Sequence, residues 1–139
     1  MVAGYGAPLP QKLGIKPGIR LGVIGAPRGF EEALGGLDGV RVVRSARGPL
    51  SLIVAFFYAR ARLQRRLPAL CASLEPSGGL WVAWPKRASG VASDLDENVV
   101  RELGLAAGLV DNKVCAIDET WSGLRLVYRL RDRPRARAC

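Results

Sequence analysis

An almost unbroken apolar run constrains the fold of this chain more than any other feature. The run extends from Leu50 to Ala59, and its one polar interruption is Ser51. A strand that is apolar at nearly every position is typical of the centre of a parallel sheet, where helices cover both faces. The run is also too short to cross a bilayer, which takes about 20 residues. We therefore expect a buried central strand in a cytoplasmic protein with no membrane partner.

Segments with strand and helix patterns alternate around this run. Strands are predicted at 20–24, 40–43, 50–58, 80–84, within 109–117, and at 124–130, and helices at 7–14, 30–34, 60–74 and from about 93 to 107. This alternation predicts an α/β fold of three layers, Rossmann-like, with a mainly parallel sheet of about six strands. A hairpin-like turn before the sixth strand makes that last strand antiparallel. Residues 1–130 are expected to form a single domain, followed by a basic tail at 131–139.

Three local features sharpen or complicate this prediction. The link 44–49 is too short to hold a crossover helix, so the second strand is either an edge strand with a bare crossover or antiparallel. Residues 76–79 (Pro-Ser-Gly-Gly) are predicted to turn into the fourth strand. Ser93 or Asp94 is predicted to cap the following helix, with Asp96 and Glu97 in its first turn.

The residue types that the chain lacks exclude several kinds of chemistry. Its 139 residues contain no histidine, which removes Ser-His-Asp and Cys-His catalysis and any histidine-bound metal. The three cysteines form no CxxC pair, so neither a disulfide framework nor a cysteine zinc site is predicted. We expect no metal and no cofactor.

The net charge of +9 raises nucleic acid as one alternative partner. Part of this charge lies in the arginine-rich segment 129–137, and the rest is spread along the chain. Arg62, Arg65 and Arg66 fall off the leucine stripe of the helix at 60–74, which is typical of a solvated helix face. The charge distribution alone therefore does not decide between a nucleic-acid partner and a basic surface without one.

The carboxyl ends of the parallel strands are the predicted site of function. Ligands of open α/β sheets bind outside these ends, and the segment Gly78–Gly90 places two cations, a hydroxyl and a glycine directly after a strand. Four loops would meet there. The candidate ligand-binding residues in these loops are Arg28, Gly29, Lys86, Arg87, Ser89, Asp118, Glu119 and Trp121.

Two interpretations of these residues stay open. Cations beside glycine-turn amides can form a cradle for a small anionic ligand. Alternatively, Lys86 and Arg28 pair with Asp118 and Glu119 and only brace the loops. Trp121 is predicted to be an exposed ring in a loop, suited to stacking or to a protein partner.

The other two tryptophans lie in or beside the fourth strand. Trp81 is predicted to be core. Trp84 is predicted to be core or to line a pocket.

Three segments resemble a known family. They are Gln11–Gly18, Leu80–Gly90 with its Trp-Pro-Lys motif, and Gly108–Leu124 with its Asp-Glu-Thr-Trp-Ser-Gly motif. The chain resembles the bacterial family labelled domain of unknown function 3052 over nearly all of 2–128. The resemblance implies a small Rossmann-like cytoplasmic protein, and it implies no activity.

The outline also looks like a shortened class I methyltransferase. The glycine motif of those enzymes is not met, because Pro27 and Arg28 stand where the backbone should close on a cofactor. The acidic residue that would hold a ribose after the second strand is also missing, since Val43 is followed by Arg44.

The sequence therefore leaves three candidate functions. The first is a non-catalytic binding or regulatory module with an anion-binding pocket. The second is a reduced methyltransferase-like or nucleotide-handling enzyme. The third is a nucleic-acid-binding protein that uses its arginine-rich surface and tail.

Overall fold

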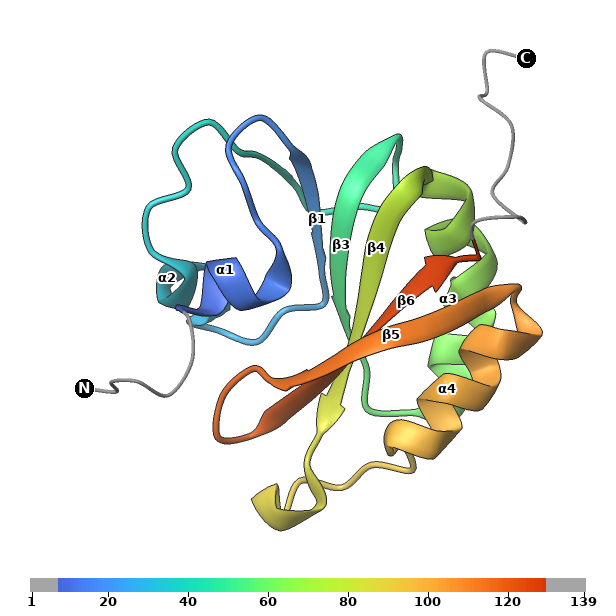
Figure 1. The fold of residues 1–139 in the computed structure, drawn as a ribbon. Coiled ribbons are helices and arrows are strands. Elements are labelled where there is room, and N and C mark those ends of the chain that lie inside the picture. Colours follow the sequence, from blue (N-terminus) through green and yellow to red (C-terminus); the bar gives the residue numbers. More distant parts are fainter. Residues whose placement is uncertain (1–7, 130–139) are drawn as a thin grey trace.

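A six-stranded sheet in the order β2-β1-β3-β4-β6-β5 forms the middle layer of the computed structural model, which describes residues 8–129 (Figure 1). The strands are β1 (Arg20–Ile24), β2 (Arg41–Val43), β3 (Leu50–Phe56), β4 (Leu74–Pro85), β5 (Leu109–Ala116) and β6 (Trp121–Tyr128). The strands β1 to β4 pair in parallel, whereas β6 is antiparallel to both β4 and β5. The predicted Rossmann-like sheet with an antiparallel last strand is confirmed.

Helices cover both faces of this sheet, as the apolar character of β3 requires. The helices are α1 (Leu9–Leu13), α2 (Phe30–Leu34), α3 (Arg60–Ser73), α4 (Glu97–Ala106) and the short 3₁₀ helix η1 (Arg87–Ser89). Side chains of α1 and α2 pack into one hydrophobic cluster, and side chains of α3 and α4 pack into another on the opposite face. From Leu52 to Phe56, successive residues of β3 alternate between the two clusters, so this strand joins them.

The short second strand lies at one edge of the sheet. Arg41 pairs with Arg20 and Val43 with Gly22 in parallel register. Residues 44–49 then cross to β3 without a helix. Of the two alternatives for this strand, the structure has the parallel edge strand with a bare crossover.

The predicted turn at residues 76–79 lies inside β4, which begins at Leu74 and not after the turn. The register to β3 shifts there, since Leu50 pairs with Leu74 but Leu52 pairs with Gly79, so the segment is an irregularity within the strand. The two glycines of this segment allow close packing. A Cβ at Gly78 would lie 2.6 Å from the Ser51 carbonyl oxygen, and one at Gly79 would lie 2.5 Å from the Arg125 guanidinium. Glycine is common where a strand is approached this closely. The Pro-Ser-Gly-Gly sequence therefore marks a crowded irregularity within β4 and not a connection that precedes the strand.

The cap of α4 also differs from the prediction. The carboxylate of Asp96 accepts the backbone N–H of Val99 at 2.8 Å, so Asp96 is the N-cap. Asp94 instead accepts the Arg60 N–H at the start of α3, and the Ser93 hydroxyl donates to the Tyr58 carbonyl. Ser93 and Asp94 thus hold the loop between β3 and α3, and it is Asp96 that caps the N-terminus of α4.

Trp81 and Trp84 are both buried, which confirms Trp81 as core and selects core packing for Trp84. The two rings point to opposite faces of β4, since they belong to different clusters. The indole N–H of Trp81 donates to the Leu13 carbonyl at 2.9 Å and so ties α1 to the sheet.

The predicted basic tail at 131–139 lies outside the described residues. Among residues 8–129, no helix combines the length and the apolar character that a bilayer crossing requires.

Replacing Asp96 with alanine tests the cap assignment. Asp96→Ala leaves the Val99 N–H without its side-chain acceptor, so we expect it to lower the free energy of unfolding by about 1 kcal/mol. Urea unfolding followed by circular dichroism measures this loss. Glu102→Ala, an exposed change on the same helix, serves as control and should stay within about 0.5 kcal/mol of the parent. Equal losses in the two variants would contradict the assignment.

Candidate functional site

The carboxyl ends of β1, β3, β4 and β5 all open on the same edge of the sheet. β1, β3 and β4 are parallel, and β5 has their direction because β6 lies antiparallel between β4 and β5. The loop after β1 and the turn between β5 and β6 therefore meet at this edge, although about 90 residues separate them in sequence.

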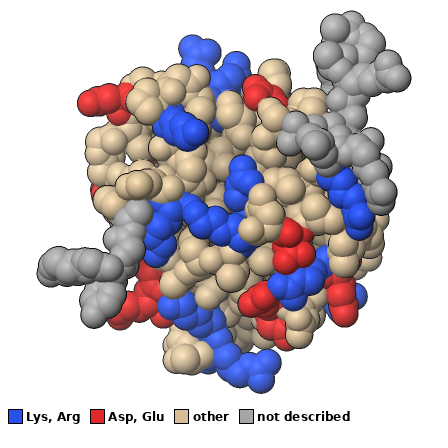
Figure 2. Space-filling view, viewed as in Figure 1, with Lys and Arg blue, Asp and Glu red and all other residues tan. Residues whose placement is uncertain are grey.

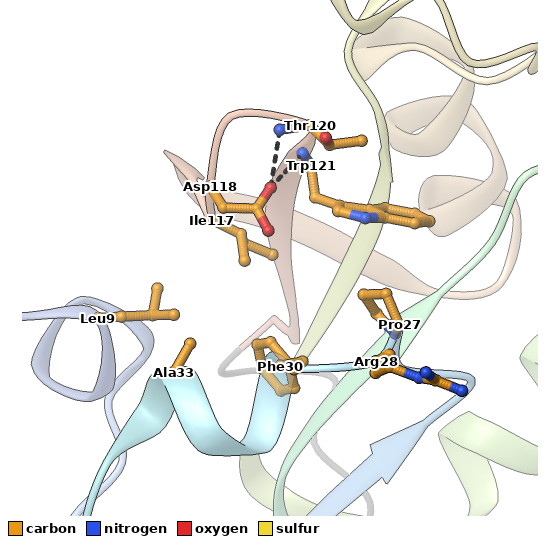
Figure 3. A pocket seen from close by; sticks show the side chains of 10 residues that line it. Leu9, Pro27, Arg28, Phe30, Ala33, Ile117, Asp118, Thr120 and Trp121 are labelled. Atoms are coloured by element: carbon orange, nitrogen blue, oxygen red, sulfur yellow. Dashed lines mark hydrogen bonds between the residues drawn. The ribbon is translucent and has the colours of Figure 1, made fainter.

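A hollow of about 290 Å³ lies between these two segments (Figure 3). We call it the edge hollow. It is lined by Leu9, Pro27, Arg28, Gly29, Phe30, Ala33, Ile117, Asp118, Thr120 and Trp121. Its volume lies just below the usual range for small-molecule sites, which begins at about 300 Å³.

Apolar side chains form the base of the edge hollow. The ring of Phe56 lies edge-on to Phe30 and to Trp121, with centroid separations of 4.8 and 5.1 Å. Both Phe30 and Trp121 are buried, as is Ile117. The predicted exposed ring at Trp121 is therefore wrong, because this residue is the first of β6 and only 4% of its surface is exposed. Tyr58, which contacts Trp121 edge-on, is the exposed aromatic residue at this edge.

The turn between β5 and β6 is organised by Asp118. Its Oδ1 accepts the backbone N–H groups of Thr120 and Trp121, both at 2.8 Å. This side-chain mimic of a backbone turn is a common role of aspartate. The other carboxylate oxygen points toward the edge hollow (Figure 3). The rim therefore presents an acceptor as well as the cationic Arg28.

Lys86 supports this turn from β4. Its backbone N–H donates to the Thr120 carbonyl and its Nζ donates to the Asp118 carbonyl, each at 2.7 Å. In the described residues, no carboxylate forms an ion pair with Lys86 or Arg28. The bracing interpretation thus holds for Lys86, through carbonyl oxygens in place of the predicted carboxylates. Arg28 takes no part in it, and its side chain extends away from Asp118 (Figure 3).

The eight predicted site residues divide into three groups. Those that line the edge hollow are Arg28, Gly29, Asp118 and Trp121. Lys86 does not line the hollow but is hydrogen-bonded to the turn that lines it. Arg87, Ser89 and Glu119 do not line the hollow, and the Ser89 hydroxyl donates to the Lys86 carbonyl at 2.7 Å.

Six lining residues are missed by the sequence prediction: Leu9, Pro27, Phe30, Ala33, Ile117 and Thr120. The four that are apolar side chains other than proline read as core in the sequence. All six except Leu9 and Ala33 directly flank a predicted site residue, and this adjacency is the one signal that the sequence offers.

A second, more open hollow of about 330 Å³ adjoins the first and shares Pro27, Arg28 and Gly29 with it. It lies between the loop after β1 and the end of β2. Arg44 donates there to Glu31 from both Nε and Nη2. The Arg44 guanidinium lowers the pKa of the Glu31 carboxyl through these hydrogen bonds, and Glu31 raises the pKa of Arg44. A cation paired with α2 therefore occupies the end of β2.

No family model matches the chain, and no curated protein matches it in sequence. Solved structures are similar in fold. A SAM-dependent methyltransferase from Aquifex aeolicus aligns with a TM-score of 0.61 and 17% identity, over 84% of this chain and 85% of that one. Magnesium protoporphyrin IX methyltransferase from Synechocystis, solved with bound SAH, aligns with a TM-score of 0.57 and 9% identity, over 81% and 75%.

The mitomycin 7-O-methyltransferase MmcR aligns with a TM-score of 0.64 and 10% identity, over 81% of this chain but only 49% of its own. The chain thus spans about half the length of that enzyme. At these identities the likeness shows a class I methyltransferase-like fold.

Comparing Lys86→Ala with Arg87→Ala tests whether the Lys86 side chain stabilises the turn between β5 and β6. Lys86→Ala removes the Nζ bond to the Asp118 carbonyl, and we expect a loss of about 1 kcal/mol in the free energy of unfolding. Amide exchange at Thr120 and Trp121 should accelerate. Arg87→Ala removes an exposed side chain next to it in sequence and should change stability by less than about 0.5 kcal/mol. Unchanged exchange in Lys86→Ala would show that the turn does not depend on this lysine.

Proposed function

We propose that this chain is a non-catalytic binding module that holds a small organic anion with an apolar group in the edge hollow. The observation that carries the proposal is the lining of this hollow, where an apolar base meets an arginine and an aspartate at the rim. Ligand sites commonly combine a mostly apolar wall with a few polar groups that fix orientation.

Arg28 is the group that supports an anionic ligand. Its guanidinium is exposed, and in residues 8–129 no carboxylate is paired with it. A carboxylate or phosphate could therefore accept two parallel N–H bonds from it. The base of Leu9, Phe30 and Ile117 would then contact the apolar part of the same ligand.

The charged groups at the rim support binding without catalysis. The whole chain lacks histidine, and arginine does not deprotonate in proteins. One oxygen of Asp118 is already committed to two backbone N–H groups. The rim thus offers hydrogen-bonding groups for a ligand, but it does not offer a general acid paired with a general base.

A methyltransferase-like enzyme is the second candidate, and the similar structures favour it. The residues of this chain do not fit S-adenosylmethionine held in the usual Rossmann manner. An arginine paired with Glu31 stands at the end of β2, where a carboxylate would bind a ribose. Pro27 in the loop after β1 has no N–H to offer a ligand. We therefore derive no methyl-transfer step.

Two further roles stay open as proposals. A short segment of another protein could enter the same hollow in place of a small molecule. Nucleic-acid binding would depend on the arginine-rich segment, most of which lies outside the described residues. Membership of the domain of unknown function 3052 family stays a prediction from the three sequence segments.

Titration with phenylacetate, an apolar group joined to a carboxylate, tests the proposed function. Followed by amide chemical shifts, it should give saturable changes at Gly29, Phe30, Ile117 and Asp118. Arg28→Ala should weaken binding roughly tenfold, which corresponds to the loss of one charge-assisted contact. Arg87→Ala removes the same charge outside the hollow and is the matched control.

The same protein should show no saturable thermal stabilisation by S-adenosylmethionine. Saturable stabilisation by the methyl donor, with shifts at Glu31 and Arg44, would overturn the proposal in favour of the second candidate. Equal weakening of phenylacetate binding in Arg28→Ala and Arg87→Ala would overturn the assignment of Arg28.

A further inference from the structure

Among residues 8–129, the half of the sheet formed by β6 and β5 has no helix packed over it on the face that carries α1 and α2 (Figure 1). Side chains of α1 and α2 cluster with those of β1, β3 and β4, whereas α4 packs on β5 and β6 from the opposite face. Figure 2 shows lysine and arginine side chains over the middle of this face, between α1 and the β5–β6 pair. The uncovered half is therefore a basic surface.

A hollow of about 270 Å³ lies at this place, and we call it the basic hollow. It is lined by Lys12, Leu13 and Gly14 from the end of α1, Asn112 and Lys113 from β5, and Arg125 from β6. Trp81 pairs with Arg125, and Arg125 pairs with Lys113. These three side chains therefore share one face of three adjacent strands, and the basic hollow begins where the cover of α1 ends.

Reciprocal hydrogen bonds between α1 and β5 hold the two lysines, Lys12 and Lys113, in place. Lys12 donates from Nζ to the Ala116 carbonyl at 3.1 Å, and Lys113 donates from Nζ to the Lys12 carbonyl at 3.0 Å. Each ammonium has three N–H donors, so each retains two. Burial raises the pKa of the Cys115 thiol. The charges of Lys12 and Lys113 act in the opposite direction and offset part of this rise.

Arg125 is half-buried and poorly compensated. Burial lowers the pKa of its guanidinium, and its bond to Asn112 Oδ1 is long, at 3.4 Å. The guanidinium lies directly over Gly79, where a Cβ would stand 2.5 Å from its nitrogens. Because glycine has no side chain, Gly79 leaves the space in which the Arg125 guanidinium packs against the sheet. Partial burial of a charge is costly without an opposite charge, and the basic hollow contains no carboxylate in the described chain.

We infer that the basic hollow binds the phosphate group of a small phosphorylated molecule. Three cations around one space match a phosphate dianion better than a single carboxylate. The Arg125 fork can bind two phosphate oxygens, the lysines can act as point charges, and the amide nitrogen of Asn112 is a further donor. This site is separate from the edge hollow, with which it shares no lining residue.

A small molecule fits this place better than a nucleic-acid strand. Single-strand binding combines a basic groove with exposed aromatic rings on which bases stack. None of the residues that line the basic hollow is aromatic. Trp81 beside it is fully buried, and Tyr58 is the exposed large aromatic residue in residues 8–129 but lies at the carboxyl edge after β3.

Titration of the full chain with inorganic phosphate at constant ionic strength tests this inference. We expect saturable amide shift changes at Gly14, Asn112, Lys113 and Arg125. Arg125→Gln and Lys113→Gln should each weaken binding roughly tenfold. Arg62→Gln, which removes one positive charge from the exposed face of α3, is the control and should bind as the parent does.

Each alternative outcome overturns the inference. Shifts that fail to saturate, or equal weakening in Arg62→Gln, would show a general response to charge. Shifts confined to Arg28 and Gly29 would place the anion in the edge hollow. Binding of a single-stranded oligonucleotide at Asn112 and Lys113 without any response to phosphate would replace the small molecule with a nucleic acid. Because Lys113 is exposed, Lys113→Gln keeps the test valid even if Arg125→Gln does not fold.

Discussion

The hydrogen bond from the Trp81 indole to the Leu13 carbonyl is the interaction on which the rest of this structure depends. A helix of five residues is too short to be stable by itself. α1 is therefore held by what it contacts: the buried side chain of Leu13 and the indole N–H beneath it. Without that donor, the Leu13 carbonyl at the end of the helix would lose a buried partner.

Both hollows depend on this helix. Leu9 at its start lines the edge hollow, and Lys12, Leu13 and Gly14 at its end line the basic hollow. Two glycines make room for the side chains beneath: a Cβ at Gly123 would lie 3.1 Å from the Trp81 ring, and Gly79 admits Arg125. The strands β4 and β6 thus carry both large side chains because each side chain lies against a glycine of the neighbouring strand.

The order of the last two strands then decides what the two hollows contain. Since β6 lies between β4 and β5, the turn after β5 comes to the carboxyl edge and brings Asp118 opposite Arg28. The same pairing sets Arg125 between Trp81 and Lys113. One hollow therefore has an apolar base with mixed charge at its rim, and the other has cations and an amide.

Sequence periodicity predicted the elements whose pattern is local. The apolar run of β3 required a central strand, and α2 has the predicted bounds 30–34. The prediction failed where a residue serves a distant partner. Residues 76–79 read as a turn because nothing in their vicinity reveals the close approach of Arg125 to Gly79.

The sequence predicts a loop position for Trp121 for a related reason. The sequence does not show that Asp118 closes the turn within three residues and so returns the ring to the core. The basic hollow could not be predicted either, because Lys12 and Lys113 lie 101 positions apart in sequence.

The exchange rate of the Trp81 indole proton with solvent tests the anchoring of α1 most directly. In deuterated buffer, we expect the Nε1–H signal of Trp81 to persist as long as the slowest backbone amides of β4, since opening α1 is needed to expose it. A signal that disappears as fast as that of a free indole would show that Trp81 does not anchor α1, and both hollows would then have no fixed support.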